Sequence, residues 1–102
     1  MLIKLPITTP IVILNANPAR RRFTIQMQAE LVDANNLGKV FIGVGFQPTA
    51  TVGAHLQGEV LIQSAVIEKP ESGHVLEDNE KAIIWAVSDT ADQTIIVEEY
   101  NV

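Results

Sequence analysis

Hydrophobic and polar residues alternate along most of this chain with a period of two. In residues 23–28 the apolar side chains of Phe23, Ile25 and Met27 are separated by polar ones. Residues 94–100 repeat the pattern, with Ile95 and Val97 on one face. Alternation of this kind predicts β-strands with one buried face, and no segment keeps the 3.6-residue period of an amphipathic helix.

Other segments are apolar without alternating. Residues 61–67 and 82–87 are almost uniformly apolar, which predicts central strands covered on both sides. In residues 40–45, Gly43 and Gly45 fall on the second face, where they allow a bulge or a close approach of another backbone segment. Residues 29–36 fit either a single helical turn or a wide loop.

Turn-forming residues separate these segments at 15–18, 35–38, 48–53, 70–73 and 88–92. About seven to eight short strands at this spacing predict an all-β fold, either a single antiparallel β-sandwich or a jelly-roll-like barrel. We expect one domain over residues 11–102 and an extended N-terminal arm over residues 1–10. The arm contains Pro6 and Pro10, so it either lies on a neighbouring subunit or forms an edge strand.

The composition indicates a protein that associates with others. Of the 102 residues, 47% are hydrophobic and only 19% are charged, so few charges are present to cover the surface. We therefore expect some apolar surface to meet another subunit in a homo-oligomer. The longest apolar runs, 11–14 and 82–87, are too short to cross a bilayer, and residues 1–14 lack the order of a signal peptide. These features predict synthesis in the cytoplasm and no membrane partner.

The charges are few and segregated along the sequence. The net charge of −5 argues against nucleic-acid binding, which needs a basic face. Four of the seven basic residues precede Phe23, whereas residues 68–80 and 98–99 carry much of the acid. This distribution suggests a basic edge and an acidic edge suited to head-to-tail or subunit-to-shell contacts.

The basic residues Arg20, Arg21, Arg22 and Lys4 are the candidate partner-binding residues. Alternation extended back from Phe23 places Arg20 and Arg22 on the outward face and Arg21 on the Phe23 side. Guanidinium groups match carboxylates in a bidentate geometry, so this strand could dock on an acidic partner surface. The alternative is that the arginines pair with Glu98, Glu99 or the acidic segment of the same chain, or lie in water.

No catalytic, cofactor-binding or metal-binding residues are assigned, and we expect no enzymatic activity. The only histidines, His55 and His74, have no spacing that makes them converge on a metal, and the absence of cysteine excludes thiolate ligands. None of the serines that could join a Ser-His-Asp arrangement (Ser64, Ser72 and Ser88, with Asp89 and Asp92) lies in a Gly-x-Ser-x-Gly turn.

Three further features of the sequence are explained most simply without a functional site. The glutamates and aspartate of residues 68–80 lack the ligand order of a calcium loop and are expected to form a solvated hairpin loop. Gly43-Val44-Gly45 is not followed by a helix that could hold a phosphate. Trp85 is expected in the core rather than on an exposed sugar-stacking surface.

The order of the motifs resembles that of small β-sandwich proteins of tailed-phage virions. Those proteins share three elements: an Asn-Pro turn entering an arginine-rich strand, a glycine-containing strand, and a Pro-Thr segment followed by Gly, Leu and Gly. Here the elements are Ala16-Asn17-Pro18 with residues 20–26, residues 36–45, and Pro48-Thr49 with Gly53, Leu56 and Gly58. The tryptophan segment around Trp85 and the final strand, residues 94–98, are similar as well.

The resemblance implies a homo-oligomer, with a trimer favoured, that is located in the virion. Its partner would be the major capsid protein or another virion protein, and its role that of a head decoration or cement protein that stabilises the capsid without chemistry. The alternative is a tail or fibre module that binds a host-surface glycan or another virion protein. The polar loop 29–37 is longer than a tight hairpin requires and could recognise such a partner.

Overall fold

Two antiparallel four-stranded sheets stack face to face, as the alternation of the sequence predicted. The computed structural model describes residues 1–28, 36–51, 56–71 and 74–101. These residues form eight strands: β1 (Leu2–Leu5), β2 (Ile11–Leu14), β3 (Arg22–Met27), β4 (Val40–Val44), β5 (Glu59–Leu61), β6 (Val66–Lys69), β7 (Ile84–Ser88) and β8 (Gln93–Tyr100). A single turn of 3-10 helix, η1 (Asp78–Lys81), precedes β7. In the described part of the chain, no helix is long and apolar enough to span a membrane.

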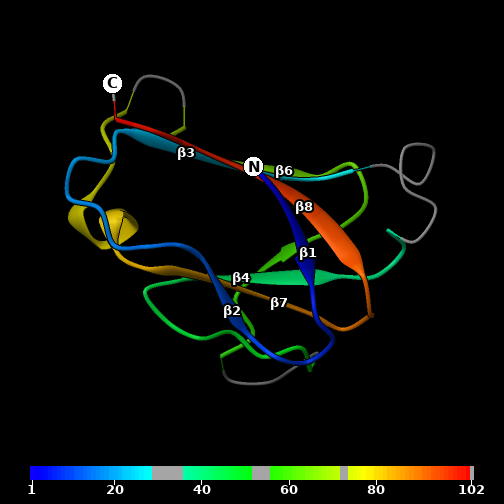
Figure 1. The fold of residues 1–102 in the computed structure, drawn as a ribbon. Helices are drawn as coiled ribbons and strands as arrows, with labels where there is room; N and C mark the ends of the chain where they lie inside the picture. The colour runs from blue at the N-terminus through cyan, green and yellow to red at the C-terminus, as the bar shows by residue number, and fades with distance from the viewer. Residues whose placement is uncertain (29–35, 52–55, 72–73, 102) are drawn as a thin grey trace.

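The strand order is that of a jelly roll. Sheet A has the order β1-β8-β3-β6, and sheet B has the order β2-β7-β4-β5 (Figure 1). The hydrogen-bonded pairs are nested, because β1 pairs with β8, β2 with β7, β3 with β6 and β4 with β5. A long antiparallel hairpin rolled into two sheets has this order.

The core lies between the sheets and is built from the alternating positions. Phe23, Ile25 and Met27 of β3 are fully buried, and so is Ile95 of β8. The intervening residues of β3, Thr24 and Gln26, lie on the outer face of sheet A, because successive side chains of a strand point to opposite faces. The alternation in residues 23–28 and 94–100 therefore predicted the buried faces of β3 and β8 correctly.

The sequence predicted central strands, covered on both sides, at residues 61–67 and 82–87. This prediction holds for residues 82–87 only. β7 lies between β2 and β4, as expected for residues 82–87. Residues 61–67, however, leave sheet B at the end of β5 and enter sheet A at the start of β6, and both strands are edge strands. Their apolar composition does not require a central strand, because Ile62 and Val66 are more than half exposed at 53% and 54%.

Residues 2–5 form an edge strand of sheet A, one of the two alternatives for the N-terminal arm. Leu2 is paired with Ile96 and Leu5 with Gln93. The backbone N–H of Val97 also donates to the carbonyl oxygen of Met1 at 2.8 Å. Pro6 follows the strand, where it removes no hydrogen bond from the ladder.

Part of the outer face of sheet B is buried by other residues of the chain. Phe41 and Val87 are register partners on β4 and β7, and both are fully buried although they do not belong to the core between the sheets. The chain after β4 returns over this face, where Pro48 is buried. A Cβ atom on Gly43 would lie 2.3 Å from the carbonyl oxygen of Phe46, so only glycine permits this close approach, as the sequence indicated.

We expect Gly43→Ala to lower the free energy of unfolding by about 2 kcal/mol, because the added methyl group meets backbone rather than a movable side chain. Urea denaturation followed by tryptophan fluorescence measures the effect. A loss below about 0.5 kcal/mol, the usual range for surface substitutions, would contradict the close packing of residues 46–48 on β4.

Candidate partner-binding surface

A turn at residues 17–20 brings the chain into β3 and positions the three arginines. The N–H of Ala19 donates to Oδ1 of Asn17 at 3.0 Å, and the N–H of Arg20 donates to the carbonyl oxygen of Asn17 at 3.1 Å. Pro18 occupies the second position of this turn, for which its fixed φ is well suited. The Asn-Pro motif identified in the sequence is therefore a turn that fixes where β3 begins.

The turn reverses the expected directions of Arg20 and Arg21. Arg20 is 1% exposed, whereas Arg21 is exposed. Alternation predicted the opposite and was wrong here, because β3 begins only at Arg22 and the period of two does not extend into the turn. Arg22, the first strand residue, has the predicted outward direction.

The buried guanidinium of Arg20 is bound entirely within the chain. Its Nε donates to Oε2 of Glu99 at 2.7 Å, and Nη2 donates to the carbonyl oxygen of Asn15 at 2.7 Å. Nη1 donates to the carbonyl oxygens of Glu80 and Ala82, at 2.8 and 2.9 Å, at the end of η1. Arginine side chains commonly satisfy the free carbonyl groups at the end of a helix in this way.

Arg20 consequently joins the turn, η1 and β8, and its side chain is not available to a partner. For Arg20, the structure shows the second of the two sequence-based alternatives, an ion pair with Glu99 of the same chain. Partner contact through the remaining three basic residues stays a prediction.

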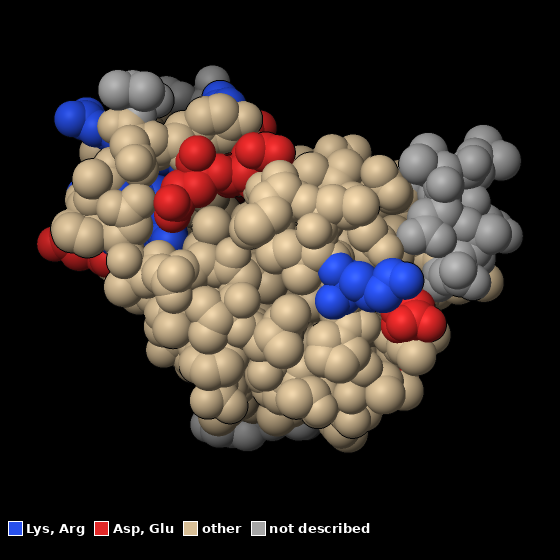
Figure 2. All heavy atoms as spheres, in the orientation of Figure 1, with Lys and Arg blue, Asp and Glu red and all other residues tan. Residues whose placement is uncertain are grey.

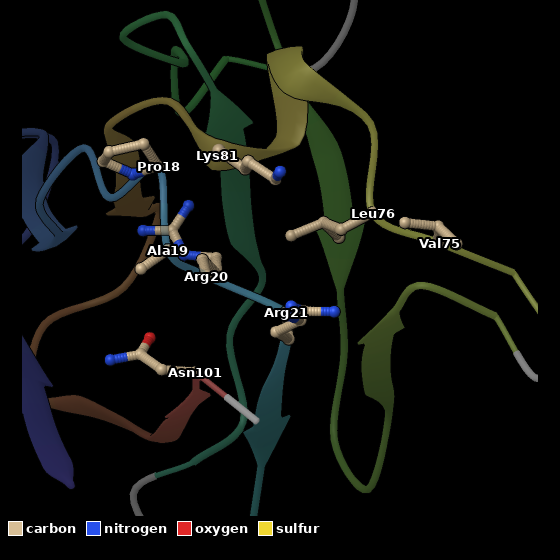
Figure 3. A pocket seen from close by; sticks show the side chains of 8 residues that line it. All are labelled: Pro18, Ala19, Arg20, Arg21, Val75, Leu76, Lys81 and Asn101. Carbon is tan, nitrogen blue, oxygen red and sulfur yellow. The ribbon is translucent and has the colours of Figure 1, made fainter.

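Arg21 lies at the edge of a groove of about 360 Å³. The groove is lined by Pro18, Ala19, Arg20, Arg21, Val75, Leu76, Lys81 and Asn101. Figure 3 shows Pro18 and Lys81 on one side of it, Arg21 and Asn101 on the other, and Val75 and Leu76 beyond them. Arg21 forms no ion pair among the described residues, and Val75 is 82% exposed. The groove thus combines a free guanidinium with an accessible apolar side chain.

Arg22 and Lys4 lie outside this groove. The Arg22 guanidinium stacks on the ring of Tyr100 at 4.2 Å from its centroid and is 3.7 Å from Oε1 of Glu68. Lys4 is exposed on β1 opposite Thr94, six residues along β8 from the partner of Arg22. Six strand residues correspond to about 20 Å, so the structure does not gather all four candidate residues into one site.

The acidic residues lie beside the basic ones rather than on an opposite edge. A second depression, next to the first, is lined by Lys69, Pro70, Glu71, His74, Val75, Glu77 and Glu80. Val75 lines both depressions. The expected single hairpin loop is also absent from the described part of this segment, because β6 ends at Lys69 and η1 follows at Asp78.

The remaining candidates are dispersed. Ser88 is buried, and its hydroxyl donates to the carbonyl oxygen of Thr90, whereas His74 is exposed in the second depression. His55, Ser72, Gly53 and residues 29–35 of the predicted loop lie outside the described residues. Within the part that is described, no three His, Cys, Asp or Glu side chains form a group that could hold a metal ion.

Trp85 is neither in the core nor fully exposed. It is half-buried on β7, opposite Gly43 of β4 and Val12 of β2. The sequence-based expectation of a core tryptophan was therefore only partly right. Its neighbours Ile84 and Ala86 are the core residues of this strand.

The fold separates the charges by sheet, which no local pattern revealed. The strands of sheet A contain six charged residues (Lys4, Arg22, Glu68, Lys69, Glu98 and Glu99). The strands of sheet B contain one, Glu59. On the face seen in Figure 2, most charged side chains gather at the upper left, a second small group lies at the right near mid-height, and the lowest part carries none.

Comparison with known proteins gives no family for this chain: no family model, no curated protein and no solved structure matches it.

Proposed function

We propose that this chain is a non-enzymatic virion structural protein, a decoration or cement protein that binds a phage head and stabilises it through protein–protein contacts. The observation that carries the proposal is the groove beside the Asn17–Arg20 turn, where the Arg21 guanidinium has no ion pair among the described residues. A free guanidinium next to exposed apolar surface suits a carboxylate-bearing segment of another protein.

The rigidity of the groove supports this use. Its floor is fixed by the buried Arg20 side chain, which binds three carbonyl groups and Glu99. The Asn17 amide donates to Oδ1 of Asn101 at 3.0 Å, which fixes the end of β8 against the turn. A preformed site loses little conformational entropy when a partner binds.

The jelly-roll order is compatible with the proposal but does not select it. Virion proteins, lectins and cupins all use this architecture, so the fold alone does not assign a function. The motif resemblance to small phage proteins is the reason for choosing a capsid as the partner, and the homo-oligomer that it implies is part of the proposal.

The alternative, a tail or fibre module that binds a host glycan, would need exposed aromatic rings close together. Trp85 is half-buried on sheet B, and Tyr100 lies on sheet A beneath the Arg22 guanidinium. Since the two rings belong to different sheets, they do not form one stacking surface. The groove therefore favours a protein partner over a glycan.

We expect the purified chain to cosediment with expanded empty capsids assembled from the major capsid protein of the same genome. Arg21→Glu should weaken this binding about tenfold or more, because it places a carboxylate where the partner's carboxylate would bind. Lys39→Glu, an equal change of charge at an exposed site outside the groove, should leave binding unchanged.

Two results would contradict the proposal. If the wild-type chain stays in the supernatant, the capsid is not its partner. If Arg21→Glu and Lys39→Glu bind equally well, the groove is not the docking site. Circular dichroism of both variants establishes that they are folded.

A further inference from the structure

The outer face of sheet A carries an ordered pattern of apolar and charged side chains. One row of paired residues crosses the sheet from β1 through β8 and β3 to β6, and it consists of Leu2, Ile96, Gln26 and Val66. Leu2 is 66% exposed and Val66 is 54% exposed, so apolar side chains at both edges of this sheet face solvent.

A charged row lies on one side of the apolar row. Glu98, Thr24 and Glu68 follow one another across β8, β3 and β6. At the β1 end of this row, the amino group of Met1 lies 2.8 Å from Oε1 of Glu98. One step further along the strands, Tyr100 is opposite Arg22.

This arrangement is complementary to itself. Consider a two-fold axis that runs parallel to the strands between β8 and β3 and relates two sheets packed face to face. The axis exchanges β8 with β3 and β1 with β6, so that each row of one copy meets the same row of the other. Face-to-face sheets pack about 10 Å apart with nearly aligned strands, which lets the rows meet.

Every contact that the axis creates in these rows is favourable or neutral. Leu2 of one copy faces Val66 of the other, and Ile96 faces Gln26. The Met1 amino group faces the second copy's Glu68, and Glu98 faces Thr24. Arg22 faces Tyr100 of the other copy, which repeats between copies the cation–π contact already present within each.

We propose that the outer face of sheet A is a homodimer interface, in which two copies of this chain pack back to back about such an axis. The partner on this face is a second copy of the chain, because the two-fold axis places each row against the same row of the other copy. In these rows no two like charges face each other. An isologous interface of this kind requires a self-complementary patch. The charges at its rim fix the register, while the apolar row is removed from water.

This interface uses a surface different from the groove beside Arg21, so it does not depend on the proposed function. A trimer, which the sequence resemblance implies, cannot be built from a two-fold contact alone. The mass in solution therefore separates the two arrangements.

Light scattering after size exclusion tests the proposal, and we expect the wild-type chain to have the mass of a dimer. Val66→Glu should raise the dimer dissociation constant about tenfold or more, because it places a carboxylate against Leu2 of the other copy. Val60→Glu is the matched control, since it introduces the same charge at an exposed valine on an edge strand of sheet B and should leave the dimer intact.

A mixing experiment tests the axis. Leu2→Lys alone should also give monomers, but an equimolar mixture of Leu2→Lys and Val66→Glu chains should form a heterodimer, because the new lysine and the new glutamate then face each other. Within one chain these positions lie on opposite edges of the sheet, about 14 Å apart, so they cannot pair internally.

A monomeric or trimeric wild-type chain would overturn the proposal, and so would a dimer that Val66→Glu leaves unchanged. If the mixture stays monomeric, the axis is wrong. Because Val66 is exposed, its substitution should not unfold the protein, and the far-ultraviolet circular dichroism of each variant checks this.

Discussion

Arg20→Met should lower the free energy of unfolding by about 3 kcal/mol or more, the largest effect we expect from a single polar substitution in this chain. Methionine keeps most of the volume of arginine but donates no hydrogen bond. The carbonyl groups of Glu80, Ala82 and Asn15 would lose their shared donor, and the Glu99 carboxylate would lose its partner. Each buried acceptor left without a partner is costly.

The estimate is at the lower end of the range for buried ion pairs, because the Glu99 side chain is 27% exposed and water can reach it. In a thermal melt, a loss of this size should lower Tm by more than about 10 °C. Arg21→Met is the matched control, since the neighbouring side chain is exposed and forms no ion pair among the described residues. Equal melting temperatures for the two variants would show that Arg20 does not stabilise the fold.

Asn36→Leu should lower the free energy of unfolding by about 3 kcal/mol, for a similar reason. Asn36 is fully buried, and its side chain bridges the backbone of Gln28, just after β3, and that of Thr94 in β8. Its Nδ2 donates to the carbonyl oxygens of Gln28 and Thr94 at 3.0 and 2.9 Å, and its Oδ1 accepts the N–H of Thr94 at 2.7 Å. Leucine of nearly the same size would leave all three backbone groups without these partners.

Urea denaturation of Asn36→Leu and of Asn79→Leu compares this buried asparagine with an exposed one. The Asn79 variant should change the free energy by less than about 0.5 kcal/mol. If the Asn36 variant behaves in the same way, the amide is not essential to the junction between β3 and β8.

Neither residue could be identified from the sequence. Arg20 stands in a run of three arginines, and its burial depends on the carbonyl groups of η1, some 60 residues away in the chain. Asn36 stands in a turn-rich segment and was expected only to mark a loop. In both cases the partner is a backbone group brought near by tertiary contacts, and a sequence pattern carries no information on such a pairing.

The same limit explains why residues 61–67 and the acidic segment were misplaced. Apolar composition in residues 61–67 indicates burial but not the position of a strand in its sheet, since exposed apolar residues are common at protein surfaces. One interpretation of the charge distribution gave the arginines and the acidic segment separate edges, and the other paired them within the chain. The turn at Asn17 and the end of β6 bring the two together at one end of the sandwich.

Patterns in the sequence were enough to predict the all-β class, the approximate number of strands, most of the turns and the inward faces of β3 and β8. These features are local, because the period of two and the turn residues act on neighbouring positions. Long-range packing set the nested strand order, the burial of Arg20, the covering of sheet B by residues 46–48 and the separation of charge between the sheets. Those features depend on which distant segments meet, and that is set by the packing of the whole chain around one core.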